Sequence, residues 1–280
     1  MTQALPLLIP CMLRWFAWAL LVASVGIAVQ ATDRNEALVI DARLVGLAAR
    51  EAGARMVLAA LGLVAFGRSR PAAAPVVAGR LVVRTPPVLL VPGATWNRAS
   101  LWPLRTFLVQ RGFPWVWAID RGGRDRTLAT EAAELARAVD ELARTAGTEK
   151  VDLVAFSTGG LVAAWYLRHH GSDRVRRLIT LGTPWKGTRM AVFGRGPGVD
   201  EIRYGSHALD GLWPPPVPTT CVHSPDDPVV VPASSAAPDH GGVLVAVESA
   251  GHVDMLVSAR VYRAVQIALT AAEPAVGAPA

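Results

Sequence analysis

A serine stands at the end of a buried strand pattern, where a hydroxyl is unusual. The stretch VDLVAFSTGG, residues 151–160, is mostly apolar up to Ser157 and then breaks into a threonine and two glycines. A tight turn from a strand into a helix strains the serine backbone and requires small residues two positions before and after it. Ala155 and Gly159 meet this requirement. The pattern predicts either a nucleophilic Ser157 at the carboxyl end of a strand or an ordinary serine cap on a helix.

A serine hydroxyl is a weak nucleophile at neutral pH and needs an imidazole that takes its proton. His252 is the best candidate, because it follows the last predicted strand and precedes the last predicted helix. The imidazole needs a carboxylate in turn, and the stretch CVHSPDDPVVVP offers Asp226 and Asp227 after a predicted strand. The other histidines lie on predicted helices, in a strand or in other loops: His169, His170, His207, His223 and His240.

The elements that would position these residues are short apolar runs that alternate with helical patterns. Leu135, Val139 and Leu142 share one helical face, and that helix should stop near Gly147. The alternation predicts an α/β fold with a mostly parallel central sheet flanked by helices. The predicted strands, all expected to be buried on both faces, are 88–91, 115–119, 151–156, 178–181, 219–223 and 243–247.

Several motifs resemble those of one enzyme family. The serine stretch resembles the G-x-S-x-G nucleophile elbow of the α/β-hydrolases, in the A-x-S-x-G form known among bacterial lipases. The stretch LGTPWKGT, residues 181–188, resembles the L-G-T-P-x-x-G-T segment of bacterial triacylglycerol lipases and is the most specific motif. GSHALDGL and VSARVY extend the resemblance over residues 86–270. It implies the α/β-hydrolase fold and a serine lipase or esterase. The apolar N-terminus separately predicts a hydrophobic helical segment before that domain.

The resemblance also implies roles for particular residues. The pattern S-x-x-D-x-V-V places the acid at Asp227, with Asp226 as the alternative, and His252 resembles the Gly-His turn of the family. The order serine, aspartate, histidine is that of the α/β-hydrolases. The backbone N–H groups of Thr158 and Ala94 would form the oxyanion hole, the second after a Pro-Gly turn that resembles its lipase counterpart.

Departures from the family pattern bear on substrate preference, because none of them removes a catalytic atom. Ala155 replaces the elbow glycine, and Phe156 stands where a histidine is frequent. Trp185 and Lys186 stand where family members often carry a histidine and another polar residue.

A long insertion, residues 188–216, is rich in glycine and proline and lies where lipases carry a lid. A loop of this length is usually functional or disordered, and we expect it to shield an acyl-binding groove. Trp96 and Trp185 are predicted to contact substrate, with Trp213 near the mouth; the alternative is that these aromatic residues belong to the core.

The N-terminus is the most apolar part of the chain. Residues 15–29 carry no charge, and with the preceding segment the apolar stretch reaches 25 residues interrupted only by Arg14. This length is enough for a bilayer span of about 20 residues. We predict a membrane anchor in residues 1–31 and therefore a membrane-associated protein. The alternatives are a signal cleaved near Ala31, followed by export, and a soluble hydrophobic helix.

The rest of the chain divides by composition. Residues 32–75 are predicted to form a helical membrane-proximal segment and a Pro/Ala/Arg-rich linker. The helical part is either a membrane-surface helix or re-entrant piece, or a helix packed on the domain that follows. Residues 76–272 form the predicted catalytic domain, and residues 273–280 a disordered tail.

Composition excludes several functions. The chain is 52% hydrophobic and 18% charged, and its net charge of +6 comes from scattered arginines without a basic block, which argues against nucleic acid. The sequence lacks a phosphate loop, a dinucleotide fingerprint and an HExxH zinc motif. Cys11 and Cys221 give neither a disulfide framework nor a metal site. We therefore expect no cofactor and no metal, and the oligomeric state stays open.

Three functions fit these residues. The first is a serine carboxylic-ester hydrolase that acts on lipid or acyl esters through an acyl-enzyme. The second is an acyltransferase of the same fold, and the third is a non-catalytic binding protein on a hydrolase fold. Sequence does not separate glyceride, phospholipid and polyester substrates, or the two sides of a membrane.

Overall fold

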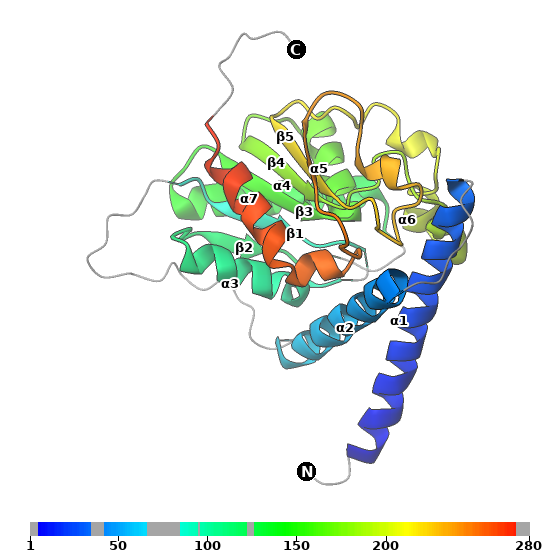
Figure 1. Ribbon diagram of the computed structural model, residues 1–280. Helices are drawn as coiled ribbons and strands as arrows, with labels where there is room; N and C mark the ends of the chain where they lie inside the picture. Colours follow the sequence, from blue (N-terminus) through cyan, green and yellow to red (C-terminus); the bar gives the residue numbers. More distant parts are fainter. Residues whose placement is uncertain (1–4, 35–41, 66–84, 95, 122–125, 273–280) are drawn as a thin grey trace.

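The computed structural model describes residues 5–34, 42–65, 85–94, 96–121 and 126–272 (Figure 1). The predicted linker at 67–75 and the predicted tail at 273–280 lie outside the described residues.

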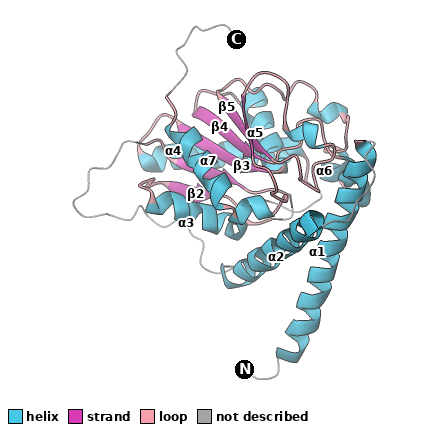
Figure 2. Ribbon diagram, viewed as in Figure 1, coloured by secondary structure: helices cyan, strands magenta, loops and turns pink. Residues whose placement is uncertain are grey.

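A single sheet of six parallel strands forms the centre of the domain, in the order β2-β1-β3-β4-β5-β6. Helices lie around these strands (Figure 2). This architecture confirms the predicted α/β class, and each predicted strand run is present with boundaries shifted by at most a few residues. The strands are β1 Val88–Val91, β2 Val116–Ala118, β3 Val151–Phe156, β4 Val175–Leu181, β5 Thr219–His223 and β6 Val243–Ala246.

Helices cover both faces of the sheet, because strand side chains point alternately to the two faces. In β1, Val88 and Leu90 face the core shared with α3 Trp102–Gln110 and α7 Ala259–Thr270. Leu89 faces the other core, which α4 Leu128–Ala146 and α5 Thr158–His169 cover. The predicted helix stop is confirmed, since Gly147 takes a left-handed conformation (φ 63°) at the end of α4.

Strand β6 differs from the prediction. It forms an edge of the sheet, and Val243 and Leu244 are 61% and 43% exposed. The prediction that this run is buried on both faces is therefore wrong. It holds only in part for β2 at the opposite edge, where Trp117 and Ala118 are half-buried. An apolar run of four residues does not distinguish an edge strand from a central one, because that depends on which strands pair beside it.

Two helices precede the sheet, α1 Leu5–Asp33 and α2 Ala42–Ala65. They pack against each other, and α2 also packs on two 3-10 helices of the domain, η1 Arg98–Leu101 and η5 Asp254–Val257. Leu58 of α2 is buried in the same core as β1. Helix α2 therefore packs on the domain, while its position near a membrane stays a prediction.

The C-terminal half of α1 lies against the domain, while its N-terminal part projects away from it (Figure 1). Ala23, Gly26 and Gln30 share one helical face and are buried. Among the residues that the structure describes, no helix combines the length and apolar character needed to cross a membrane. The transmembrane anchor predicted within residues 1–31 is thus not confirmed.

The insertion is folded into short helical pieces, η2 Arg189–Phe193, α6 Pro197–Asp200 and η3 His207–Leu209. The Thr188 hydroxyl anchors its start by donating to the Val229 carbonyl at 2.6 Å. Val192 and Phe193 in η2 are 63% and 68% exposed. The assignment of this segment as a lid stays a prediction.

Candidate active site

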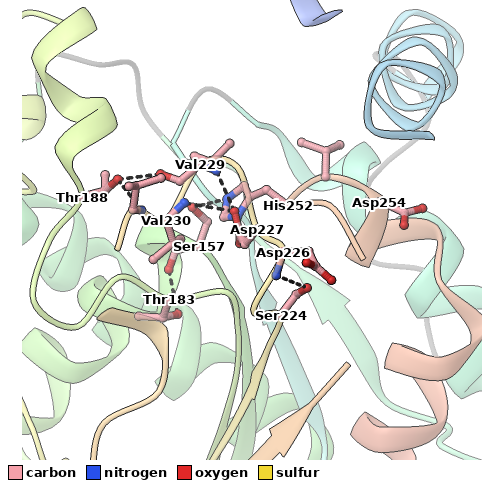
Figure 3. Close-up of polar contacts among 12 residues, drawn as sticks. Ser157, Thr183, Thr188, Ser224, Asp226, Asp227, Val229, Val230, His252 and Asp254 are labelled. Atoms are coloured by element: carbon pink, nitrogen blue, oxygen red, sulfur yellow. Dashed lines mark hydrogen bonds and ion pairs between the residues drawn. The ribbon is translucent and has the colours of Figure 1, made fainter. Parts of the chain in front are cut away.

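Ser157 lies in the tight turn between β3 and α5, in a conformation rare for a side-chain-bearing residue (φ 56°, ψ −129°). The surrounding structure holds this strained backbone on both sides. The Ser157 N–H donates to the Leu181 carbonyl at 2.7 Å. The Ser157 carbonyl accepts from the Thr183 hydroxyl at 2.8 Å (Figure 3). The turn therefore fixes the hydroxyl at the carboxyl end of a central strand, as the small-residue pattern predicted.

Glycines allow the close approach that this turn requires. A Cβ at Gly159 would lie 2.6 Å from the Pro92 carbonyl oxygen, and one at Gly93 would lie 2.9 Å from the Ser157 Cβ. A Cβ at Gly160 would collide with the side chain of Thr183. Side chains at these positions would push apart the turn after β1, the elbow and the turn after β4.

The structure brings Ser157, His252 and Asp227 together in one hydrogen-bonded chain (Figure 3). Ser157 Oγ lies 2.9 Å from His252 Nε2, and His252 Nδ1 lies 2.7 Å from Asp227 Oδ2. The three residues are 9%, 3% and 0% exposed. This is the geometry in which an imidazole can take a proton from a serine while a carboxylate orients the ring.

The two adjacent aspartates have different partners. Asp227 Oδ1 accepts from the backbone N–H groups of Val229 and Val230 at 2.8 and 3.0 Å, which leaves Oδ2 directed at the imidazole. Asp226 Oδ2 instead accepts from the Ser249 N–H at 2.8 Å. The structure thus brings Asp227, and not the sequence alternative Asp226, to His252.

Apolar and backbone atoms enclose the imidazole. The Phe156 ring lies 4.8 Å from that of His252, tilted by 38°, so the residue that departs from the family pattern contacts the ring directly. A Cβ at Gly182 (φ 57°) would lie 3.1 Å from Asp227 Oδ2 and 3.2 Å from His252 Nδ1. In such low-dielectric surroundings the hydrogen bonds of the chain are electrostatically stronger than in water.

The predicted oxyanion donors lie on either side of the elbow, but one of them has an internal partner. The Ala94 N–H donates to the Thr158 hydroxyl oxygen at 2.8 Å. The same oxygen accepts from Arg121 Nη1 at 2.8 Å, and that nitrogen also donates to the Pro92 carbonyl at 2.9 Å. Burial lowers the pKa of Arg121 to about 9, so the guanidinium, ion-paired with Glu131, is charged at neutral pH. No sequence motif pointed to this arginine.

A buried glutamate from the N-terminal helices also reaches the site. Glu51 in α2 is completely buried, and its Oε2 accepts from the Val253 and Asp254 N–H groups at 2.8 and 3.1 Å. Its Oε1 pairs with Arg55 at 2.9 Å. Burial raises the pKa of Glu51, while the charges of Arg55 and His252 oppose that rise. Sequence reasoning missed this residue, because it lies in the segment assigned to the membrane side.

Helix α1 contacts the loop that carries Asp227. Gln30 Nε2 donates to the Pro225 carbonyl at 2.6 Å, and a Cβ at Gly26 would lie only 1.7 Å from the Pro228 carbonyl oxygen. Asp33 pairs with Arg189 of the insertion at 2.8 Å. The N-terminal helices therefore contact both loops that supply the acid and the imidazole.

The tryptophans expected at a substrate groove lie in or against the core. Trp185 is 3% exposed and belongs to the core beneath α4 and α5, with its ring 4.7 Å from that of Trp213. Its predicted substrate contact is not supported, and the core alternative describes it better. Trp96 is half-buried and packs against the opposite core, the one that contains Phe156.

Histidine, cysteine and acidic side chains outside this triad are the remaining candidates for nucleophiles or metal ligands, and His207 and Cys221 do not contact it. The exposed His207 pairs with Asp210 at 3.0 Å. Cys221 is a buried free thiol, and burial raises its pKa. In the described part of the chain, no group of three or more histidine, cysteine, aspartate or glutamate side chains could hold a metal ion.

Comparison with known proteins identifies the fold. Residues 86–201 match a family model described as the alpha/beta hydrolase fold. A lipase of Bacillus licheniformis in its mature form superposes with a TM-score of 0.62 at 18% identity, over 69% of this chain and 95% of that one. The protein therefore has the α/β-hydrolase fold, as the elbow and the LGTPWKGT motif predicted.

Two further solved structures share this fold at low sequence identity. Lipase B of Aspergillus fumigatus has a TM-score of 0.59 at 18% identity over 68% of this chain, which spans only 53% of that lipase. A bromoperoxidase of Bacillus anthracis has a TM-score of 0.53 at 16% identity, over 66% of this chain and 91% of that one. Because proteins with different activities share the fold, the function must be argued from the site.

Proposed function

We propose that the protein is a serine carboxylic-ester hydrolase that acts on lipid or acyl esters. The observation that carries this proposal is the unbroken hydrogen-bonded chain from Ser157 through His252 to Asp227, at a strained turn. A serine with a cap role alone would need neither a buried imidazole at 2.9 Å nor a carboxylate with both oxygens engaged.

In the proposed reaction, Ser157 Oγ attacks the ester carbonyl carbon while His252 Nε2 takes its proton. The imidazolium is stabilised by Asp227 and then donates that proton to the departing alcohol. Water, deprotonated by the same imidazole, attacks the acyl-enzyme, and the proton returns to Ser157 Oγ as the acid leaves.

The oxyanion of each tetrahedral intermediate needs donors that are already aimed at it. The Thr158 N–H at the start of α5 is one candidate, and the helix dipole adds to its effect. The Ala94 N–H is the second, and to serve it must exchange the Thr158 hydroxyl for the oxyanion.

Exposed apolar side chains on the insertion and on the N-terminal helices are compatible with a lipid partner. Val192 and Phe193 of the insertion are exposed, as are Leu21, Val45 and Val57 on the N-terminal helices. We extend the proposal to a membrane-associated site of action, where such side chains would meet lipid. Flotation with liposomes of anionic and zwitterionic phospholipid tests this extension: protein that stays at the bottom of the gradient with both would contradict it.

Labelling with a fluorophosphonate probe tests the chemistry. The folded wild-type protein should be labelled on Ser157, located by mass spectrometry, and should hydrolyse p-nitrophenyl butyrate. Ser157→Ala and His252→Ala should lose both the label and the turnover, because the first lacks the nucleophile and the second its base. A wild-type protein that is folded but neither labelled nor active on soluble and emulsified esters would overturn the proposal.

A further inference from the structure

We propose that Glu51, on the N-terminal helix α2, is a positioning residue of the active site that holds the His252 loop at the distance the proton relay needs. This inference rests on the proposed hydrolase function, because it assigns Glu51 a part in that reaction. Glu51 does not touch the reacting atoms, and it acts through the backbone on either side of His252.

The contacts flank the imidazole residue in the chain. Glu51 Oε2 accepts hydrogen bonds from the backbone N–H groups of Val253 and Asp254, the two residues after His252. A Cβ at Gly251, the residue before it, would lie 2.5 Å from the same oxygen. The carboxylate therefore touches the loop both before and after His252, about 200 positions away in sequence.

A second residue of the same helix holds the same loop. Arg50 Nη2 donates to the Ser249 carbonyl at 2.9 Å, and its Nε lies 3.8 Å from Asp254 Oδ2. Ser249 has a positive φ of 55°, which marks a turn that needs support from its surroundings. Helix α2 thus binds the loop at its start and again directly after the histidine.

The burial of Glu51 argues for more than a surface cap. A carboxylate with no exposed surface loses its hydration, and the pair with Arg55 and two backbone donors must replace it. An apolar residue would fill this position without that cost, but it could not hold two N–H groups at the start of η5. A buried acceptor specifies where the loop sits, and an apolar contact does not.

Position matters here because the imidazole makes two short hydrogen bonds at once, 2.9 Å to Ser157 and 2.7 Å to Asp227. Misplacement of a reacting group by about 1 Å can cost about 100-fold in rate. Loss of the Glu51 carboxylate should therefore lower kcat by about 10- to 100-fold. KM should change little, because Glu51 contacts the loop and not the substrate.

The decisive experiment compares three variants with the full-length wild type. Glu51→Ala removes the acceptor. Glu51→Gln combined with Arg55→Met keeps an oxygen for both N–H groups and removes the guanidinium that would lose its partner. Leu135→Ala is the stability control, since it opens a cavity in the core under α4, away from the loop.

Three measurements are made on each protein. They are the melting temperature, kcat and KM on p-nitrophenyl butyrate, and the low-field resonance, in proton NMR, of the proton in the His252–Asp227 hydrogen bond, called the signal below. Glu51→Ala should lose or shift the signal and lower kcat, while the double variant should keep the signal and recover most of kcat. Leu135→Ala should lower the melting temperature with kcat and the signal unchanged. A folded Glu51→Ala with the signal and kcat of the wild type would overturn the inference, as would an equal loss of kcat in Leu135→Ala.

Two complications leave the test decisive. If Glu51→Ala does not fold, Glu51→Asp takes its place, because its shorter side chain cannot reach both N–H groups; unchanged kcat and signal in that variant would overturn the inference. If the wild type shows no esterase activity and no label, the proposed function fails, while the proton signal still tests Glu51. Its loss in Glu51→Ala but not in Leu135→Ala would then support the positioning role.

Discussion

The nucleophile and the acid–base pair are held in different ways. The Ser157 elbow is supported from within the domain, by the Leu181 carbonyl, the Thr183 hydroxyl and the glycines around it. The loops of Asp227 and His252 are contacted from outside the sheet by α1 and α2, which come from the first quarter of the chain.

The catalytic side chains are thus positioned in two different ways. The Ser157 elbow is positioned by neighbouring strands of the sheet, because strand register and small residues determine its place. The two loops lie at the surface of the sheet's carboxyl end, where a loop alone is mobile unless other elements bind it. We therefore expect the N-terminal helices to control the acid–base half of the site and to leave the nucleophile in place.

The largest effect tests the acid–base half directly. Asp227→Asn should lower kcat about 10⁴-fold, because an amide favours the wrong tautomer of His252. Steady-state kinetics on a soluble ester measure this. Asp226→Asn is the matched control: it keeps an oxygen for the Ser249 N–H and should stay within about threefold of wild type, as expected for a loop contact. Equal losses in the two variants would contradict the assignment.

A change within the elbow should come next. The Cβ of Gly159→Ala would lie 2.6 Å from the Pro92 carbonyl oxygen and 2.7 Å from that of Val91. We expect a loss of about 1–3 kcal/mol in the free energy of unfolding and of about 100-fold in kcat, measured by urea denaturation and initial rates.

The control for that change is Gly53→Ala in α2. Apart from the adjacent backbone of α2 itself, no atom lies within 4 Å of a Cβ there, so this variant should gain about 0.5–1 kcal/mol in stability and keep its activity. An active and stable Gly159→Ala protein would show that the elbow does not depend on that close approach.

A wedge between α1 and the domain should have a smaller effect. Gly26→Val places a side chain against Pro228, directly after Asp227. We expect kcat to fall about tenfold, because α1 can move away from the domain and relieve most of the overlap, so that the acid is displaced by less than the roughly 1 Å that costs about 100-fold. Fluorophosphonate should still label Ser157, more slowly.

Gly46→Ala is the matched control in α2, since its Cβ would meet only the end of the Arg50 side chain, at 3.6 Å. It should behave as wild type in kinetics and in labelling. If Gly26→Val leaves kcat unchanged, α1 does not support the Asp227 loop. Of the two N-terminal helices, only α2 would then support the acid–base half of the site.

The smallest effect is a pH dependence. Burial raises the pKa of Glu51, so the folded state binds its proton more tightly than the unfolded state does. Protonated Glu51 therefore contributes its full stability below the pKa that Glu51 has in the unfolded chain. This contribution is lost as the pH rises through the pKa that Glu51 has in the folded protein. Glu51→Gln does not titrate, so the melting temperature of wild type minus that of the variant should decrease as pH rises. A change of about 2–4 °C corresponds to about 1 kcal/mol for a domain of this size. A difference that increased with pH would reverse the sign and contradict this prediction.

The sequence predicted best those features that depend on local structure. The periodicity of the apolar runs predicted the parallel sheet, and the small residues around Ser157 predicted the elbow, because both depend on contacts between residues close in the chain or on adjacent strands. The LGTPWKGT motif at the end of the fourth strand also predicted the hydrolase fold. The exceptions are the edge strands β6 and β2, whose positions in the sheet no local pattern could indicate.

Tertiary structure decided what depends on contacts between distant segments. Asp226 and Asp227 are indistinguishable by type, and only the turn that engages Asp227 Oδ1 aims one of them at His252. The apolar N-terminal segment predicted a membrane contact, yet the same composition also packs on a domain core, as α2 does. Glu51 carries no motif, since its place beside His252 arises from helix packing across about 200 residues. Sequence patterns record the period and chemistry of each segment, whereas the partners of a segment are chosen by the shape and charge of the whole folded chain.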